Sequence, residues 1–486
     1  MICAALAFYA TAQKSLDSYR NKVNGEFEKF REKRQKEFNE YRAKINKEYA
    51  EFMRKSWKRI DGNKGMEQPI EREKPPVTIP DNTPKPIEDR PLPFDDIVTP
   101  PLPQPQPTPI KPIEDLPSID DKYVDVSDFG VSAHIVFNDN ERFRLKSISP
   151  CDIADMWVEL SDRKYNKTIS SCLKMRDDYQ LCDWAYLKML DKICQACLGN
   201  GNESTLLMAF IYCQSGYKMR LACSDSRLYM LFASRHSIYN FCTFRIDGER
   251  FYPYDCKDYS LCIFDHIFPN EKPLSLIIDK PMRLAGNDSE LRKLTSSKYP
   301  TFTTTTKVNK NVIDFYNDYP RSMLDQNIVS IWAIYANAPF SQEVQAAYYP
   351  QLRQLISGLD NEEAVQRILN YVQTSFVYGY DDDVWGHDRA FFPEETLYYP
   401  YCDCEDRAIF MSRLVRDLLG LKVILIYYPR HLALAVCFPN NSVKGDCIML
   451  NGEKYLVADP TYIGASLGMT MPNMDNSSAK VILLSS

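Results

Sequence analysis

The sequence lacks both an excess of basic charge and any long apolar run. Lys plus Arg total 59 and Asp plus Glu total 65, which gives a formal charge of −6. A general nucleic-acid-binding protein usually carries a basic excess, so we expect no nucleic-acid partner. No stretch approaches the roughly 18 consecutive apolar residues that a spanning helix needs, so we expect no transmembrane segment.

Residues 15–57 contain no proline and only one glycine. Aromatic residues recur there every eleven positions, in the rows Tyr19, Phe30, Tyr41, Phe52 and Phe27, Phe38, Tyr49. Eleven residues make three turns of an almost straight helix, so the spacing predicts a long helix over 13–60. Its aromatic stripe calls for a partner, either a second copy in a coiled coil, another protein or an envelope surface. The alternative is a solvated helix that only separates domains.

The first twelve residues, MICAALAFYATA, carry no charge and end in a small-x-small pattern. Such an ending is typical of a cleaved signal peptide, although the basic start is missing here. We interpret 1–12 as a signal peptide and the protein as exported, to the periplasm, the cell surface or the medium. Ten cysteines lie between Cys151 and Cys262, where an oxidising compartment would allow disulfides.

Proline is concentrated in one stretch, because sixteen of the 31 prolines lie between Pro69 and Pro117. Proline fixes φ and removes a backbone donor, which favours an extended chain over a helix or a sheet. We therefore interpret 61–121 as a Pro-rich linker that acts as a spacer. Two domains follow, at 122–325 and 326–486, both with mixed helix and strand patterns that predict the α+β class.

Three segments of the second domain carry chemistry. Cys404 begins a helical pattern that ends at Gly420, and a helix N-terminus favours a thiolate, although the next two residues are acidic. His431 begins one apolar strand and Asp459 ends another. This order can bring the three side chains together as nucleophile, proton carrier and orienting carboxylate. Cys402 is the rival thiol, but it precedes the helix.

The motif Cys404-Glu-Asp-Arg-Ala and the later Ala-Asp459-Pro-Thr-Tyr resemble the transglutaminase-like superfamily, over about 362–461. That family shares a papain-like Cys–His–Asp core and includes crosslinking transglutaminases, cysteine peptidases, amidases and inactive binding forms. The resemblance implies that Cys404 is the nucleophile, His431 the base and acid, and Asp459 the orienting residue. It implies no cofactor and no metal, in an exported protein of bacterial type.

Two further residues are candidates for the oxyanion site or the cleft, Trp385 and His387. A tryptophan supplies an oxyanion donor in crosslinking members, but the position of Trp385 does not clearly match, so the backbone N–H of Cys404 is preferred. We interpret the acidic run at 381–383 as part of a solvated loop, with calcium binding as the alternative.

The middle domain reads as a degenerate copy of the C-terminal one. When 204 is added to each position, Asn200 falls on Cys404, Arg227 on His431 and Asp255 on Asp459. Asparagine and arginine cannot carry out thiol–imidazole chemistry, so this domain would bind, brace or assemble. An unrelated α+β domain is the alternative.

We therefore expect a cysteine-dependent amide hydrolase or acyl transferase that acts on a protein or peptide through an acyl-enzyme. The alternative is a non-enzymatic envelope or extracellular binding scaffold.

Overall fold

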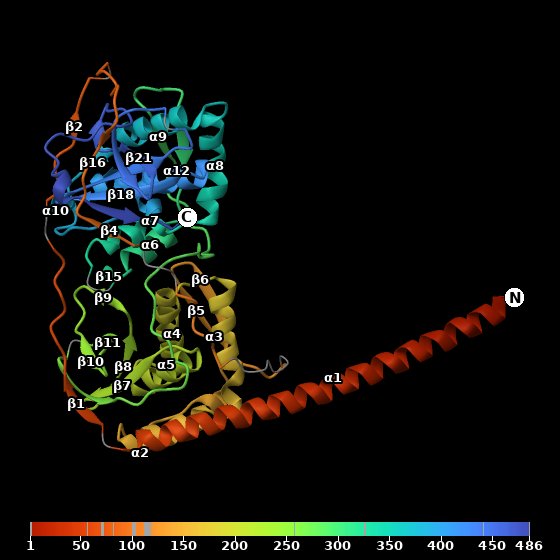
Figure 1. Cartoon of the computed structure of the whole chain (residues 1–486). Helices are drawn as coiled ribbons and strands as arrows, with labels where there is room; N and C mark the ends of the chain where they lie inside the picture. The colour runs from red at the N-terminus through yellow and green to blue at the C-terminus, as the bar shows by residue number, and fades with distance from the viewer. Residues whose placement is uncertain are drawn as a thin grey trace.

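The computed structural model describes residues 2–55, 57–69, 72–80, 82–99, 104–110, 118–256, 258–324, 327–440 and 442–485, with side chains from residue 19 onward. Two units of mixed helix and strand lie one above the other, and a long helix leads away from the lower unit (Figure 1). The predicted α+β class is confirmed. In the part of the chain described, no helix is long and apolar enough to cross a bilayer.

The helices and strands alternate along both units. The helices are α1 (Ile2–Met53), α2 (Pro150–Leu160), α3 (Asn166–Asp178), α4 (Asp183–Leu198), α5 (Asn202–Gln214), α6 (Lys310–Asn317), α7 (Ser330–Asn337), α8 (Gln342–Ile356), α9 (Asn361–Ser375), α10 (Asp381–Val384), α11 (Pro393–Tyr398) and α12 (Cys404–Leu419). Strands outside the two large sheets are β2 (Val77–Thr78), β5 (Tyr123–Asp128), β6 (Val131–Val136), β9 (His236–Ile238), β13 (Arg292–Thr295), β14 (Thr303–Thr306), β15 (Ser322–Leu324), β16 (Val377–Tyr378), β17 (Tyr401–Cys402) and β22 (Tyr462–Ile463).

The lower sheet contains six strands in the spatial order β1-β12-β7-β8-β11-β10. They are β1 (Lys58–Asp61), β12 (Ser260–Phe264), β7 (Met219–Ser224), β8 (Arg227–Ala233), β11 (Glu249–Pro253) and β10 (Phe244–Ile246). The upper sheet contains seven strands in the order β3-β20-β21-β19-β18-β23-β4. They are β3 (Arg90–Pro91), β20 (Asp446–Leu450), β21 (Glu453–Ala458), β19 (His431–Cys437), β18 (Lys422–Tyr428), β23 (Lys480–Leu483) and β4 (Asp96–Val98).

Five strands of each sheet follow the same order, since β12-β7-β8-β11-β10 corresponds to β23-β18-β19-β21-β20. The central registers also agree after 204 is added to each number. Ser224 faces Arg227 as Tyr428 faces His431. The pairings of β8 with β11 and of β10 with β11 match those of β19 with β21 and of β20 with β21 in the same way.

One ion pair is repeated at the same offset. Lys218 Nζ lies 2.7 Å from Glu249 Oε2, and Lys422 Nζ lies 2.6 Å from Glu453 Oε1. In the upper unit, Lys422 begins β18 and Glu453 begins β21. In the lower unit, Lys218 directly precedes β7 and Glu249 begins β11. The helix before each pair of strands is followed by a glycine with positive φ, +90° at Gly216 and +64° at Gly420. The likeness between the two units therefore extends from strand order to individual side chains.

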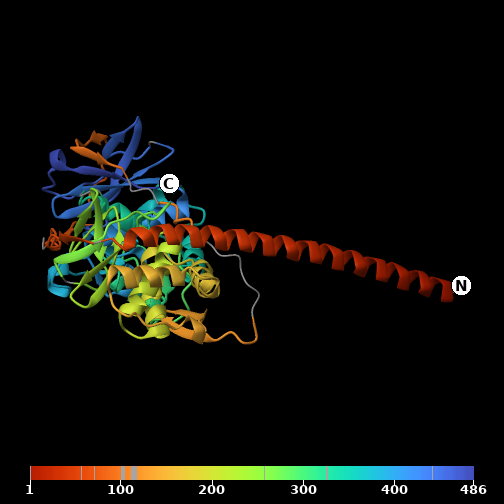
Figure 2. The same cartoon turned by 90° about the horizontal axis from the view of Figure 1, so that it is seen from below.

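The long helix expected over 13–60 is α1, but it ends at Met53 and Lys58 already begins a strand. The last third of α1 packs on the lower unit, where Tyr49 contacts Trp157 and is 2 % exposed. Farther out, α1 projects away from the body (Figure 2), and Tyr19, Phe27 and Phe30 are about 60 to 68 % exposed. The predicted signal peptide at 1–12 precedes the described side chains and stays a prediction.

The Pro-rich segment is not a free spacer, which corrects the interpretation of 61–121. Strand β1 joins the lower sheet, and β3 and β4 form both edges of the upper sheet. Seven of the sixteen prolines fall between these short strands, Pro91 lies within β3 and the other eight follow β4. An edge strand needs hydrogen bonds on only one side, so proline is tolerated in β3. In Figure 1 this segment runs up one side of the molecule from the lower unit to the upper one.

Strands β13 and β14, which precede the predicted boundary at residue 326, contact the upper unit, whereas β15, later in the chain, pairs with β9 of the lower unit. Arg292, at the start of β13, donates to the carbonyl oxygens of Thr396 and Leu397, and Thr304 bonds Tyr371. Strands β13 and β14 therefore belong to the upper unit. The cysteines from Cys151 to Cys447 are all free thiols, including the ten for which disulfides were considered.

Candidate active site

The three predicted catalytic residues lie at the ends of adjacent elements. Cys404 is the first residue of α12, and Asp403 caps that helix by accepting from the Asp406 N–H at 3.3 Å. His431 is the first residue of β19, after a two-residue turn. Asp459 follows β21 directly, and β21 pairs with β19. The predicted positions at the start of a helix, the start of a strand and the end of a strand are confirmed.

His431 and Asp459 form a buried hydrogen-bonded pair. His431 Nε2 lies 2.8 Å from Asp459 Oδ2, and the side chains are 0 % and 2 % exposed. The other carboxylate oxygen of Asp459 accepts from the Thr461 N–H at 2.9 Å. Among the described residues, His431 Nδ1 has no hydrogen-bond partner. The imidazole is thus oriented by its Nε2 atom, and its Nδ1 atom is left available.

The Cys404 thiol donates to Glu405 Oε2 at 3.3 Å and is 1 % exposed. Burial, followed by the charges of Glu405 and Asp403, raises the pKa of Cys404 well above its usual value. A hydrogen bond from the Leu432 backbone N–H lowers this pKa in part. The preference of the helix N-terminus for a thiolate is therefore outweighed in this state by burial and by neighbouring carboxylates.

Four carboxylates form a cluster beside the thiol, Glu73, Asp381, Asp403 and Glu405, with one oxygen of each within 4.8 Å of the others. Burial raises the pKa of Asp381 to about 9 and that of Glu73 to about 7. In the described chain, Asp403 Oδ2 and Glu73 Oε2 have no hydrogen-bond partner. Hard cations such as Ca²⁺ prefer this donor set, so these four residues are the ones that could hold a metal.

The expected solvated loop at 381–383 is only partly observed. Asp381 is 3 % exposed and belongs to the carboxylate cluster, which is a correction. Asp382 and Asp383 instead face the linker, where each accepts from Arg72 at 3.1 Å. The acidic run alone could not show this, because the linker that covers it lies about 310 residues away in the sequence.

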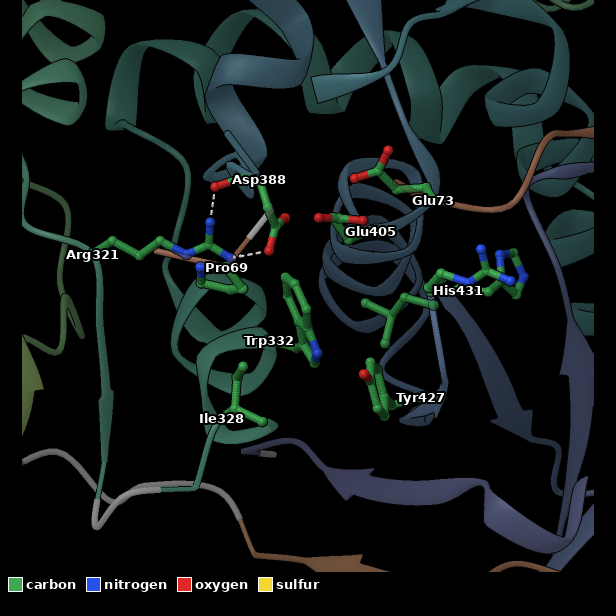
Figure 3. Close-up of a pocket in the computed structure, with 11 residues that line it drawn as sticks. Pro69, Glu73, Arg321, Ile328, Trp332, Asp388, Glu405, Tyr427 and His431 are labelled. Carbon is green, nitrogen blue, oxygen red and sulfur yellow. Dashed lines mark hydrogen bonds and ion pairs between the residues drawn. The ribbon is translucent and has the colours of Figure 1, made fainter. Parts of the chain in front are cut away.

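A small pocket opens beside the imidazole of His431 and the side chain of Glu405 (Figure 3). Its lining comes from the linker, from the residue before β15, from α7 and the segment before it, from the segment before α11, from α12 and from the β18–β19 hairpin. The lining residues are Pro69, Glu73, Arg321, Ile328, Trp332, Asp388, Glu405, Tyr427, Arg430, His431 and Leu432. Arg321 donates to Asp388 Oδ2 at 2.7 Å at one end, and Glu73 lies next to Glu405 at the centre. The pocket is thus charged on one side and aromatic, through Trp332 and Tyr427, on the other.

Neither Trp385 nor His387 lines this pocket. Trp385 packs edge-on against Tyr399 at 5.0 Å, with the Arg389 guanidinium over its ring. Sequence reasoning missed Glu73, Arg321 and Trp332, which lie in segments with no motif to mark them. The only local signal was Asp388, which directly follows the candidate residue His387.

The middle-domain counterparts are placed only in part as expected. Arg227 begins β8 and Asp255 follows β11, but Arg227 Nη2 lies 3.8 Å from Asp255 Oδ2 and both side chains are more than half exposed. Asn200 lies before the helix. Asn202, the first residue of α5, takes the helix position of Cys404, and its Oδ1 accepts from the Leu228 N–H at 2.9 Å.

The contact of Asn202 repeats that of the thiol, because Leu228 and Leu432 differ by 204. The ungapped comparison misplaced this residue by two positions, since α5 is three residues shorter than α12. A polar amide therefore stands where the upper unit has its nucleophile.

Comparison of the chain with protein-family models and with curated proteins finds no match. The site is therefore interpreted from its own residues.

Proposed function

We propose that the C-terminal domain is a transglutaminase-like cysteine enzyme that hydrolyses or transfers an amide of a protein or peptide. The observation that carries this proposal is the buried pair of His431 and Asp459, with 2.8 Å between Nε2 and Oδ2. The Nδ1 atom of His431 has no partner among the described residues, and His431 is the neighbour of Leu432 in the chain. The Leu432 N–H itself contacts the Cys404 thiol. A thiol, an imidazole and a carboxylate in this order support nucleophilic catalysis.

The proposed reaction has two steps. His431 accepts the thiol proton at Nδ1 as Cys404 Sγ attacks the carbonyl carbon, and it then protonates the leaving amine as the C–N bond breaks. Asp459 stabilises the imidazolium, and the Cys404 backbone N–H stabilises the oxyanion. Water then releases an acid from the thioester, whereas an amine in its place gives a new amide. No step needs a cofactor.

The lower unit would be a copy without this chemistry. It carries Asn202 and Arg227 where the upper unit has Cys404 and His431, while the strand order and registers match. We assign it a binding or bracing role, in a protein that is exported as its first twelve residues predict.

The second candidate function is a non-enzymatic scaffold at the cell envelope or outside the cell. One observation favours it: the thiol is 1 % exposed and donates to Glu405, so the resting site is closed and protonated.

Two cysteine variants separate these functions. Cys404→Ala should abolish peptide cleavage and amine incorporation across a panel of peptides, whereas Cys402→Ala, which alters a buried thiol two residues earlier, should retain most activity. Circular dichroism checks that both variants fold. If the wild type cleaves no amide and incorporates no amine, the scaffold function is supported. Equal losses of activity in the two variants would mean that Cys404 is not the nucleophile.

A further inference from the structure

The linker crosses the upper unit directly beside the candidate active site. The Lys74 N–H donates to the Arg430 carbonyl at 2.9 Å, and the Tyr378 hydroxyl donates to the Lys74 carbonyl at 3.0 Å. The chain then continues as β2, in parallel with β22. Both backbone polar groups of one residue are held, and Arg430 immediately precedes His431. A backbone clamp of this kind recognises an extended chain of any sequence.

The Arg72 side chain of the linker lies in a site of complementary charge. The two terminal nitrogens of Arg72 lie 3.1 Å from Asp382 Oδ2 and 3.1 Å from Asp383 Oδ2. The guanidinium also lies over the Tyr380 ring, 4.0 Å from its centroid. Paired carboxylates together with an aromatic face bind arginine better than lysine, because the planar guanidinium can bond and stack at the same time.

The next side chain, Glu73, is an acid buried among other acidic side chains. Glu73 is 6 % exposed and points into the cluster formed with Asp381, Asp403 and Glu405 (Figure 3). Its Oε2 has no partner among the described residues. A carboxylate at this position is therefore costly, and an uncharged side chain would fit better.

We propose that this groove binds an extended peptide, that residues 72–78 of the linker occupy it in the resting protein, and that the competing partner carries an arginine followed by an uncharged residue. The backbone clamp and the Arg72 site bind the linker in the groove. Glu73 weakens this binding, so that a competing peptide can displace the linker. The consequence for catalysis rests on the proposed function: the linker would keep substrate away from Cys404 until such a peptide displaces it.

The test compares alkylation of Cys404 in the full-length wild type and in the double variant Arg72→Ala/Lys74→Pro. Proline at 74 removes the clamped N–H but keeps an extended backbone next to Pro75 and Pro76. Iodoacetamide labelling is followed by peptide-mapping mass spectrometry, with the exposed Cys151 as internal reference. Losing the two charge-assisted contacts of Arg72 and one backbone hydrogen bond should speed labelling of Cys404 about tenfold or more.

A matched control and a competitor complete the test. Lys64→Ala removes a solvent-exposed ion pair elsewhere in the linker and should leave the labelling rate unchanged. A synthetic peptide copying 72–79, with Glu73→Gln, should slow labelling in the double variant, and more strongly than the peptide with the native glutamate. The same peptide with Arg72→Ala should not.

Unchanged labelling in the double variant overturns the proposal. Faster labelling that the peptide does not reverse also overturns it, because the thiol would then be exposed by local unfolding. These outcomes are independent of amide chemistry. If the groove binds peptide but the protein is no enzyme, labelling responds as expected while cleavage and amine incorporation stay absent. If the protein is an enzyme but the groove binds no peptide, activity is present and neither the double variant nor the peptide changes the labelling rate.

Discussion

Glu405 controls the state of the candidate nucleophile. It follows Cys404 in the first turn of α12, where an acidic residue normally stabilises the helix through its dipole. Here its carboxylate accepts a hydrogen bond from the thiol, with Cys404 Sγ 3.3 Å from Glu405 Oε2, and adds negative charge where a thiolate would form. The residue that supports the helix therefore opposes the reactive form of the cysteine.

Glu405→Gln should lower the pKa of the Cys404 thiol. The amide keeps the shape of the side chain but removes the negative charge that raises this pKa. Alkylation requires the thiolate, so its rate rises with pH. The midpoint of that rise should move to lower pH, and the rate at neutral pH should increase roughly tenfold. The measurement is a pH profile of iodoacetamide labelling.

Glu343→Gln is the matched control, since it alters an exposed glutamate in the first turn of α8. Its pH midpoint for Cys404 should equal that of the wild type. A Glu405→Gln profile that coincides with the wild type would mean that burial alone sets the thiol pKa.

At the scale of elements, Arg407 holds the site together. It lies one turn into α12, is 1 % exposed and donates to the carbonyl oxygens of Gln373, Phe376 and Pro460. It thereby joins the catalytic helix to the end of α9 and to the loop after Asp459. Gln373 adds a second connection by donating to the Asp459 carbonyl at 3.2 Å.

Arg407→Ala should destabilise the protein strongly. The change leaves three buried carbonyl oxygens without their donor, and the loss of a charged hydrogen-bond partner costs about 3 kcal/mol. Urea unfolding should show a lower midpoint with a similar slope. Arg413→Ala, on the same helix, removes a partly exposed pair with Asp417 and should cost about 1 kcal/mol or less. Equal costs for the two variants would contradict this assignment.

At the scale of the whole molecule, the long helix is anchored at one end. Asn46 is 0 % exposed, donates to Gln214 at 3.2 Å and accepts from Trp157 Nε1 at 2.8 Å. Arg42, one turn earlier, donates to the carbonyl oxygens of Ser161 and Asp162. The C-terminal part of the helix therefore packs on the protein's own lower unit. The aromatic residues Tyr19, Phe27 and Phe30, in the projecting part, stay exposed.

Asn46→Ala should loosen this anchor. Gln214 and the Trp157 N–H would be buried without a partner, which costs about 1–3 kcal/mol. The free energy of unfolding, measured in urea with tryptophan fluorescence as the signal, should fall by that amount. Asn24→Ala, in the projecting part of the same helix, should change it very little; a comparable loss there would contradict the anchor.

Local patterns were enough to predict several parts of this protein. The helix from Cys404 to the glycine at 420, the strands that begin at His431 and end before Asp459, and the offset of 204 all follow from short-range periodicity and turn residues. The α+β class follows from the same patterns. These features depend on residues close together in the chain, which is why sequence reasoning reached them.

Only the tertiary structure decided how the linker and the site fit together. Edge strands from the Pro-rich segment, Glu73 beside Glu405, and Asn202 in place of Asn200 all depend on contacts between distant residues or on a helix three residues shorter. The protonated state of the thiol depends on burial, which composition does not reveal. Short-range patterns carry no information about which distant side chain desolvates a charge, so only the packing shows that burial outweighs the preference of the helix N-terminus for a thiolate.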